Sequence, residues 1–256
     1  MANTCATILG VNPEQRTFLT DVSYSERKCR EHLARAKLAL VLSTASSHDD
    51  HELAKHASLV GLAVGATDDV VGRVAEALTR SLFLDLKVNF ELFLWTMCRV
   101  WLRHDLVETM RRLVAMTPQP KALKDLLKQR TIAQAFSSPD SVMFLPSQGL
   151  SILTMLLNSM TPGASVDDVN GWAQVKVAFE VRHLVEHRNG RVDDSFARSV
   201  APFWELSSWN RQTRPAVNDI VQVQAVDFEQ TYAAMDISVQ HVATKVRAGW
   251  DLRTRA

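Results

Sequence analysis

The most apolar window of the chain reads Leu82-Phe-Leu-Asp-Leu-Lys-Val-Asn-Phe-Glu-Leu-Phe-Leu-Trp-Thr-Met-Cys-Arg-Val-Trp-Leu102. Its apolar residues are too dense for the stripe of a surface helix, and a helix that is apolar on most sides belongs inside a bundle. Charged side chains such as Asp85, Lys87 and Arg99 would each cost about 2.5–3.5 kcal/mol at a bilayer centre. The window therefore predicts a core helix of an all-α protein and no membrane span.

The composition of the whole chain agrees with this class. The 256 residues are 46% hydrophobic and 22% charged, which is typical of a globular protein of one domain, or of one domain with an extension. Only 9 glycines and 8 prolines are present, too few for the many tight turns of a β-sandwich. The net charge of +1 excludes a global basic field, so any contact with nucleic acid must come from a local patch.

The cysteines and the N-terminus bear on location. Cys5, Cys29 and Cys98 are widely spaced and form no metal-binding pattern, which indicates free thiols in a reducing compartment. The first residues contain no basic region followed by an apolar run, so no signal peptide is expected. We therefore expect a cytoplasmic protein.

Periodicity and capping signals extend the helical prediction outward from the window. Residues 1–22 are expected to form an arm, and the first helix to begin at Ser23 or Ser25. The long apolar helix is expected to run from Leu82 to about Met116, either unbroken or with an interruption. The first helix is expected to continue through 27–42. Other helices are expected at 49–63, from about 70, and at 121–135, 150–157, 169–187 and 228–246, with a short helix or bent segment at 196–206, a loop at 137–140 and an extended stretch at 217–226.

The helix predicted at 169–187 has clear signals at both ends. Ser165-Val-Asp-Asp168 offers a hydroxyl cap followed by acidic residues that meet the helix dipole. Asn189-Gly190 offers a left-handed stop.

A dense cluster of titratable groups, Arg182-His-Leu-Val-Glu-His187, lies at the end of this helix. An arginine is always charged, and its planar guanidinium suits phosphate. A histidine, with an ordinary pKa of about 6.5, both takes and gives protons at neutral pH. Metal-free RNA cleavage needs these two parts. One group moves the proton of the ribose 2′-hydroxyl or of the leaving 5′-oxygen, and a cation stabilises the charged transition state.

Helical geometry limits what one copy of this segment can do. At about 100° per residue, Arg182 and His187 lie about 140° apart around the axis, whereas His183 and His187 share one face. Two copies facing each other could pool all three residues in one cleft, so this chemistry predicts a symmetric homodimer.

The segment resembles the functional motif of the HEPN family, in which an arginine, a polar residue and a histidine a few positions later lie in an all-α bundle. Here the motif is Arg182-His183, three residues and His187, followed by Arg188-Asn-Gly-Arg-Val-Asp193, which is similar to the tail of many members. The apolar helix 82–102 resembles the first core helix of the family. The resemblance covers a domain at residues 67–249, preceded by an N-terminal arm and helical extension at 1–66 that resembles nothing we can name.

The resemblance implies a metal-independent endoribonuclease without cofactor, often part of a bacterial defence or toxin system and sometimes under a regulatory partner protein. Arg182 would engage the scissile phosphate, His187 would act as general acid or base, and His183 would assist. The expected RNA-binding residues are those of the tail, Arg188, Asn189 and Arg191.

Simpler interpretations stand beside this one. Arg182 and Glu186 have the spacing of a surface ion pair, and His187 could serve only as a partner of the helix dipole. His183 and His187 have the spacing of two zinc ligands, although no third ligand is evident nearby. The main alternative is a non-catalytic HEPN-like module that binds RNA or a protein, and another is a helical scaffold without chemistry.

The tryptophans at 95, 101, 172, 204 and 209 are expected to fill the core.

Overall fold

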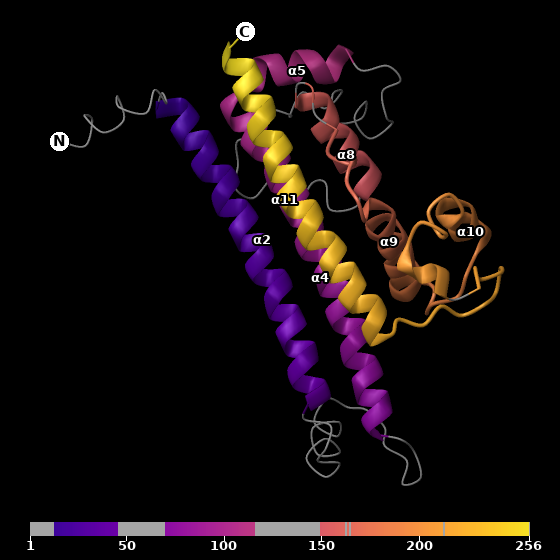
Figure 1. Cartoon of the computed structure of the whole chain (residues 1–256). Coiled ribbons are helices and arrows are strands. Elements are labelled where there is room, and N and C mark those ends of the chain that lie inside the picture. Colours follow the sequence, from indigo (N-terminus) through magenta and orange to yellow (C-terminus); the bar gives the residue numbers. More distant parts are fainter. Residues whose placement is uncertain are drawn as a thin grey trace. The chain divides into compact units, whose positions relative to one another are not determined.

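A computed structural model describes residues 13–45, 70–115, 149–161, 163, 165–211 and 213–255. The expected all-α class is confirmed for these residues, among which the pairing of extended backbone is limited to one isolated bridge between Arg191 and Ile220. The helices labelled in Figure 1 are α2 (Pro13–Ala45), α4 (Val70–His104), α5 (Leu106–Ala115), α8 (Gly149–Met160), α9 (Trp172–His187), α10 (Asp194–Val200) and α11 (Ala225–Arg255). A short 3₁₀ helix, η3 (Ser208–Arg211), lies between α10 and α11 in the chain.

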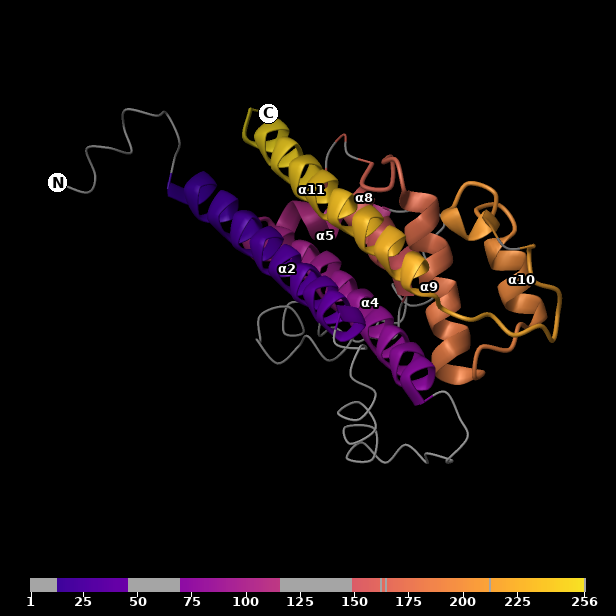
Figure 2. The ribbon, with the colours of Figure 1, turned by 60° about the horizontal axis from the view of Figure 1, so that its bottom comes forward.

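The chain divides into two compact units, and each of the long helices α2, α4 and α11 contributes one part to each unit. The first unit comprises residues 1–30, 90–169 and 237–256, and the second comprises 31–89 and 170–236. Figure 2 shows the same helices from a second direction. The boundary that the sequence predicted between residues 66 and 67 lies outside the described residues.

Aromatic side chains from three helices form the core of the first unit. Phe18 of α2 stacks on Trp250 of α11, with ring centroids 4.0 Å apart and an interplanar angle of 9°. Trp101 of α4 meets both rings edge-on, with centroids 5.4 Å from each. All three side chains are fully buried, and burying an aromatic ring of this size contributes about 1.5–3 kcal/mol or more. These contacts fix the N-terminal half of α2 in this unit.

The second unit combines an aromatic contact with a buried polar network. Phe83 of α4 packs edge-on against Trp209 of η3. The amide of Gln174 in α9 donates to Thr231 Oγ1 of α11 over 3.0 Å and accepts from the backbone N–H and the hydroxyl of Ser208 at 2.9 and 2.7 Å. Because Gln174 is buried, these bonds satisfy an amide whose isolation would be costly, and they tie α9 to two neighbours.

The predicted start of the first helix is wrong. The helix begins at Pro13, ten residues before Ser23, so residues 13–22 are helical and do not belong to an arm. Proline suits the first turn of a helix, where its missing N–H has no partner to lose. Phe18 and Val22 then continue the buried side of the helix toward Leu33.

The predicted long helix and its interruption are confirmed. Helix α4 runs from Val70 to His104, and α5 follows from Leu106. The prediction of a separate helix from about residue 70 is wrong, because that segment is continuous with the long helix as the first part of α4. The break falls at Asp105. Its carboxylate accepts hydrogen bonds from Arg253 Nε and from Arg253 Nη2, the latter over 2.9 Å.

The predicted start of the motif helix is also wrong. Helix α9 begins at Trp172 after Gly171, whose φ of 93° lies in the left-handed region, and Ser165 does not cap it. The Ser165 hydroxyl instead donates to the Asp167 carboxylate, which also accepts from Asn158 of α8 over 2.9 Å. The residues from Ser165 to Asp168 therefore form a turn after α8 and not the start of α9.

Some of the remaining helix predictions are confirmed, and the others fall outside the described residues. The helices expected near 150–157, 196–206 and 228–246 correspond to α8, α10 and α11, and α10 ends earlier than expected, at Val200. The five tryptophans predicted to fill the core are buried. The helices expected at 49–63 and 121–135 and the loop at 137–140 lie outside the described residues. None of the described helices has the length and apolarity to cross a membrane.

Candidate active site

The C-terminal end of α9 carries the motif residues, and the chain stops the helix just behind them. Asn189 and Gly190 have φ values of 52° and 80°, which confirms the predicted left-handed stop. The backbone N–H groups of Arg188 and Gly190 both donate to Leu184 O, over 2.8 and 2.9 Å. Bonds of this kind satisfy the last carbonyls of a helix and fix where its final turn ends.

The two histidines of the motif form an exposed pair. The rings of His183 and His187 lie with centroids 4.8 Å apart, as the spacing of four residues predicted. Both residues are exposed, and 54% of the His187 side chain is accessible. Two imidazoles that can exchange protons are therefore within reach of a ligand from solvent.

Arg182 and His187 meet through a third side chain. Arg182 Nη2 forms an ion pair with Glu186 Oε2, and the same oxygen lies 3.2 Å from His187 Nε2. The ion pair was expected from the sequence, and the contact with His187 was not. Although the two residues start about 140° apart around the helix, the long arginine side chain brings its guanidinium to the carboxylate that His187 also touches.

The guanidinium of Arg182 is not fully satisfied by this pair. The side chain is 19% exposed, and its Nε is buried without an acceptor in the described part of the chain. A buried donor without a partner costs about 1–3 kcal/mol. The Arg182–Glu186 arrangement therefore leaves hydrogen-bonding capacity that another acceptor could use after a small movement.

The predicted RNA-binding residues of the tail are exposed and only weakly held. Arg188 Nε lies 3.8 Å from Asp193 Oδ2, and Arg191 Nη1 reaches Asn218 O over 3.4 Å. The side chain of Asn189 is exposed and accepts two long contacts of 3.4 Å from Arg80. Exposed guanidiniums with weak partners can turn to a phosphate at little cost.

Other residues of the tail have a structural reason to be what they are. A Cβ on Gly190 would lie 2.9 Å from Val221 O, so the close approach of the backbones requires glycine. Val192 is buried, and its N–H and carbonyl bond to the segment around Asp219. Asp193 accepts from Phe196 N over 2.8 Å and so caps α10. The sequence Gly-x-Val-Asp thus joins a helix stop to the next helix start.

Arg80 of α4 belongs to the site and was missed from the sequence. Its Nη2 donates to Val185 O over 2.6 Å and also lies near Asn189. The guanidinium therefore meets the negative end of the α9 dipole and orders the turn behind the motif. Arg80 lies more than a hundred residues before its partners, and no local pattern distinguishes it from other exposed arginines.

Glu180 adds a carboxyl group on the histidine side of α9, three and seven residues before His183 and His187. Burial raises its pKa above the ordinary range, and the charge of Asp193 raises it further. Among the described residues no group of three or more His, Cys, Asp or Glu side chains could hold a metal ion, so the zinc alternative gains no support. This end of α9 thus gathers two imidazoles, a guanidinium and two carboxyl groups.

No family model matches the sequence, and comparisons with curated proteins and with solved structures also found no match.

Proposed function

We propose that this chain is a metal-independent endoribonuclease of the HEPN type that acts as a homodimer. The observation that supports the proposal best is the patch at the end of α9, where the exposed His183–His187 pair adjoins the Arg182 guanidinium. Proton-transfer groups beside a cation are the two requirements of RNA cleavage without metal.

The proposed reaction is an attack of the ribose on its own phosphate. His187 takes the proton of the 2′-hydroxyl, the 2′-oxygen bonds to phosphorus, and the bond from phosphorus to the 5′-oxygen breaks. The leaving oxygen receives a proton, for which His183 is the nearest imidazole. Arg182 stabilises the negative charge that develops on the phosphate oxygens. The products are a 2′,3′-cyclic phosphate and a 5′-hydroxyl end.

The phosphate must first replace a carboxylate. In the free chain Glu186 occupies the Arg182 guanidinium much as a phosphate would, since both present anionic oxygens to the fork. When RNA displaces it, the Glu186 carboxylate remains beside His187 and can orient that ring.

A second copy of the chain supplies the opposite wall in this proposal. The patch lies on the surface of one helix, and within one chain the Glu186 carboxylate lies between Arg182 and His187, so a single helix offers only one side of a cleft for a phosphodiester. A partner α9 facing this one would place a guanidinium and an imidazole on either side of the RNA backbone. We place the enzyme in the cytoplasm, as its widely spaced cysteines indicate, and, as the resemblance implies, in a defence or toxin system, where a partner protein can regulate it.

The decisive experiment incubates the full chain with unstructured RNA and an excess of EDTA. We expect cleavage that leaves cyclic phosphate ends, and a loss of about 100-fold or more in rate for His187→Ala, the scale of a general acid–base contribution. His32→Ala is the matched control, because His32 is an exposed histidine on α2 outside the motif. Cleavage that survives in His187→Ala would remove His187 from the mechanism.

A non-catalytic module that binds RNA or a protein is the second candidate. It is favoured by the pairing of Arg182 with Glu186 and by the structural roles of Gly190, Val192 and Asp193, which together account for much of the motif without chemistry. Wild-type protein that binds RNA with a strong salt dependence yet leaves it intact over many substrates would support this module and exclude the nuclease.

A further inference from the structure

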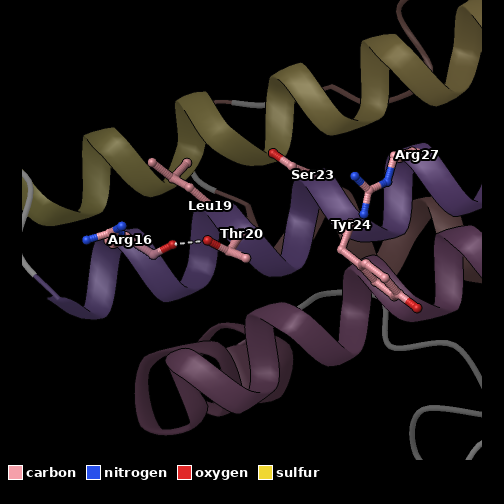
Figure 3. A pocket seen from close by; sticks show the side chains of 6 residues that line it. All are labelled: Arg16, Leu19, Thr20, Ser23, Tyr24 and Arg27. Carbon is pink, nitrogen blue, oxygen red and sulfur yellow. Dashed lines mark hydrogen bonds between the residues drawn. The ribbon is translucent and has the colours of Figure 1, made fainter. Parts of the chain in front are cut away.

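An open groove of about 390 Å³ runs along the N-terminal half of α2, in the first unit of the chain. Its lining comes from successive turns of this one helix, as Figure 3 shows. The lining residues are Arg16, Leu19, Thr20, Ser23, Tyr24 and Arg27. None of them belongs to the motif on α9.

The packing of α2 separates the charges of this stretch. Its two acids turn toward other helices: Asp21 meets His104 Nε2 of α4 at 3.0 Å, and Glu26 forms an ion pair with Arg247 of α11. Both carboxylates are largely covered, while Arg16 and Arg27 are exposed along the groove. The sequence of this stretch mixes acids and bases, but the groove itself is lined by two guanidiniums and no carboxylate.

The groove also offers an aromatic platform. Tyr24 is 54% exposed, and the cations of Arg27 and Lys28 lie 5.7 and 5.8 Å from the centre of its ring. Between the arginines lie two hydroxyls. Thr20 donates its proton to Arg16 O over 2.8 Å, and Ser23 accepts from Arg247 over 3.2 Å. Phosphate-binding guanidiniums, hydroxyls and an exposed ring in one groove are the elements that bind single-stranded nucleic acid.

We infer that this groove binds single-stranded RNA, with Arg16 and Arg27 on two phosphates of one strand and a base stacked on Tyr24. The eleven-residue interval between the two arginines corresponds to about 16 Å along the helix, which a short single-stranded segment can span. The acidic side chains of a peptide would use the guanidiniums but have no aromatic ring to stack on Tyr24, so RNA fits the groove better. The choice of RNA rests on the proposed function, and the groove would be its second RNA contact.

The first test measures binding without cleavage. A labelled 2′-O-methyl oligouridylate has no free 2′-hydroxyl to attack the phosphate, so the anisotropy of its label reports affinity alone. For the full chain carrying Arg16→Gln and Arg27→Gln we expect at least tenfold weaker binding. The slope of log affinity against log salt should also be shallower by about 1.4, the value for two lost phosphate contacts on a single strand. Tyr24→Leu should weaken binding about fivefold or more.

The matched control is Arg35→Gln, which removes an exposed arginine from the same helix but outside the groove. Equal affinity and salt slope for the double variant and Arg35→Gln would overturn the inference. So would full displacement of the oligonucleotide by a polyglutamate peptide at comparable concentration, because the groove would then be a site for acidic protein. Absence of RNA cleavage by the wild type would overturn the nuclease and leave this binding result standing.

A second measurement locates the RNA. The same oligonucleotide carrying 4-thiouridine is crosslinked to the protein by light, and the protein is digested with trypsin. Cleavage after Arg16 and Arg27 releases the peptide Thr17-Phe-Leu-Thr-Asp-Val-Ser-Tyr-Ser-Glu-Arg27, which contains the other lining residues of the groove. Crosslinks on this peptide are expected, and crosslinks confined to peptides of other helices would contradict the groove.

Discussion

One carboxylate oxygen of Glu186 touches two of the three side chains to which we assign the cleavage chemistry, Arg182 and His187. If RNA must displace this carboxylate from Arg182, its removal should favour RNA. For Glu186→Gln we expect the affinity for a non-cleavable oligoribonucleotide to rise about two- to fivefold, the equivalent of the few tenths to 1 kcal/mol that such ion pairs contribute. The salt slope should steepen by about 0.7, since Arg182 would bring one uncompensated charge to a phosphate.

The control for this variant is Glu229→Gln, which removes one negative charge from an exposed position on α11. A general effect of net charge would change both variants alike. Affinity and salt slope in Glu186→Gln that equal those of the wild type would show that the carboxylate does not compete with RNA for Arg182.

Gly190 lies in the tail of the motif, and its replacement tests the structural reading of that tail. Gly190→Ala should destabilise the protein by about 1–3 kcal/mol, because an alanine would adopt a φ of 80° and meet Val221 O at 2.9 Å. Urea denaturation measures this loss. The converse change, Asn218→Gly, replaces a residue whose φ is 78° and should leave stability unchanged or raised. Equal stability of Gly190→Ala and the wild type would contradict the close approach.

The contacts of the candidate site that sequence could predict are those set by helical spacing. The Arg182–Glu186 ion pair and the His183–His187 pair follow from residues four apart on one face. Successive residues on a helix point about 100° apart, so the spacing gave no reason to join Glu186 to His187. Arg80 comes from a distant helix, and tertiary packing alone brings it to the end of α9.

At the scale of elements, the break between α4 and α5 carries an ion pair with α11. Asp105 is 7% exposed and receives a two-pronged contact from Arg253. Arg253→Met would leave a buried carboxylate without its partner, and we expect a loss of about 1–3 kcal/mol, below the full cost of a buried pair because Arg253 is itself a third exposed. Adding Asp105→Asn should recover part of this loss.

A neighbouring arginine provides the comparison for this prediction. Arg103 also contacts an aspartate, Asp21 at 3.5 Å, but its side chain is 72% exposed. Arg103→Met should therefore cost less than about 1 kcal/mol in the same urea titration. Equal losses for the two methionine variants would show that the Asp105–Arg253 pair behaves as an ordinary surface contact.

Helix cores and the end of α9 were predictable from sequence, whereas the starts of α2 and α9 were not. The apolar run of α4 and the stop after α9 gave strong signals, since both depend on residues adjacent in sequence. The first turns of α2, which begins at Pro13, pack through Phe18 against Trp250. Because Trp250 lies more than two hundred residues later, no local pattern predicts this start. The start of α9 moved to Trp172 because Asn158 and Asp167 bind each other and retain the Ser165 segment in a turn.

At the scale of the whole molecule, the proposed homodimer predicts that two inactive variants can restore each other. Arg182→Ala and His187→Ala should each lose cleavage. If each site takes its guanidinium from one chain and its imidazole from the other, mixed dimers contain one complete site and one that lacks both groups. Random pairing makes half of the dimers mixed, so the mixture should regain about a quarter of the wild-type rate, measured after subunit exchange at low protein concentration. Sedimentation equilibrium must show dimers in the same buffer. A mixture no more active than the two variants measured separately would place both groups of one site in a single chain, where Glu186 already brings them together.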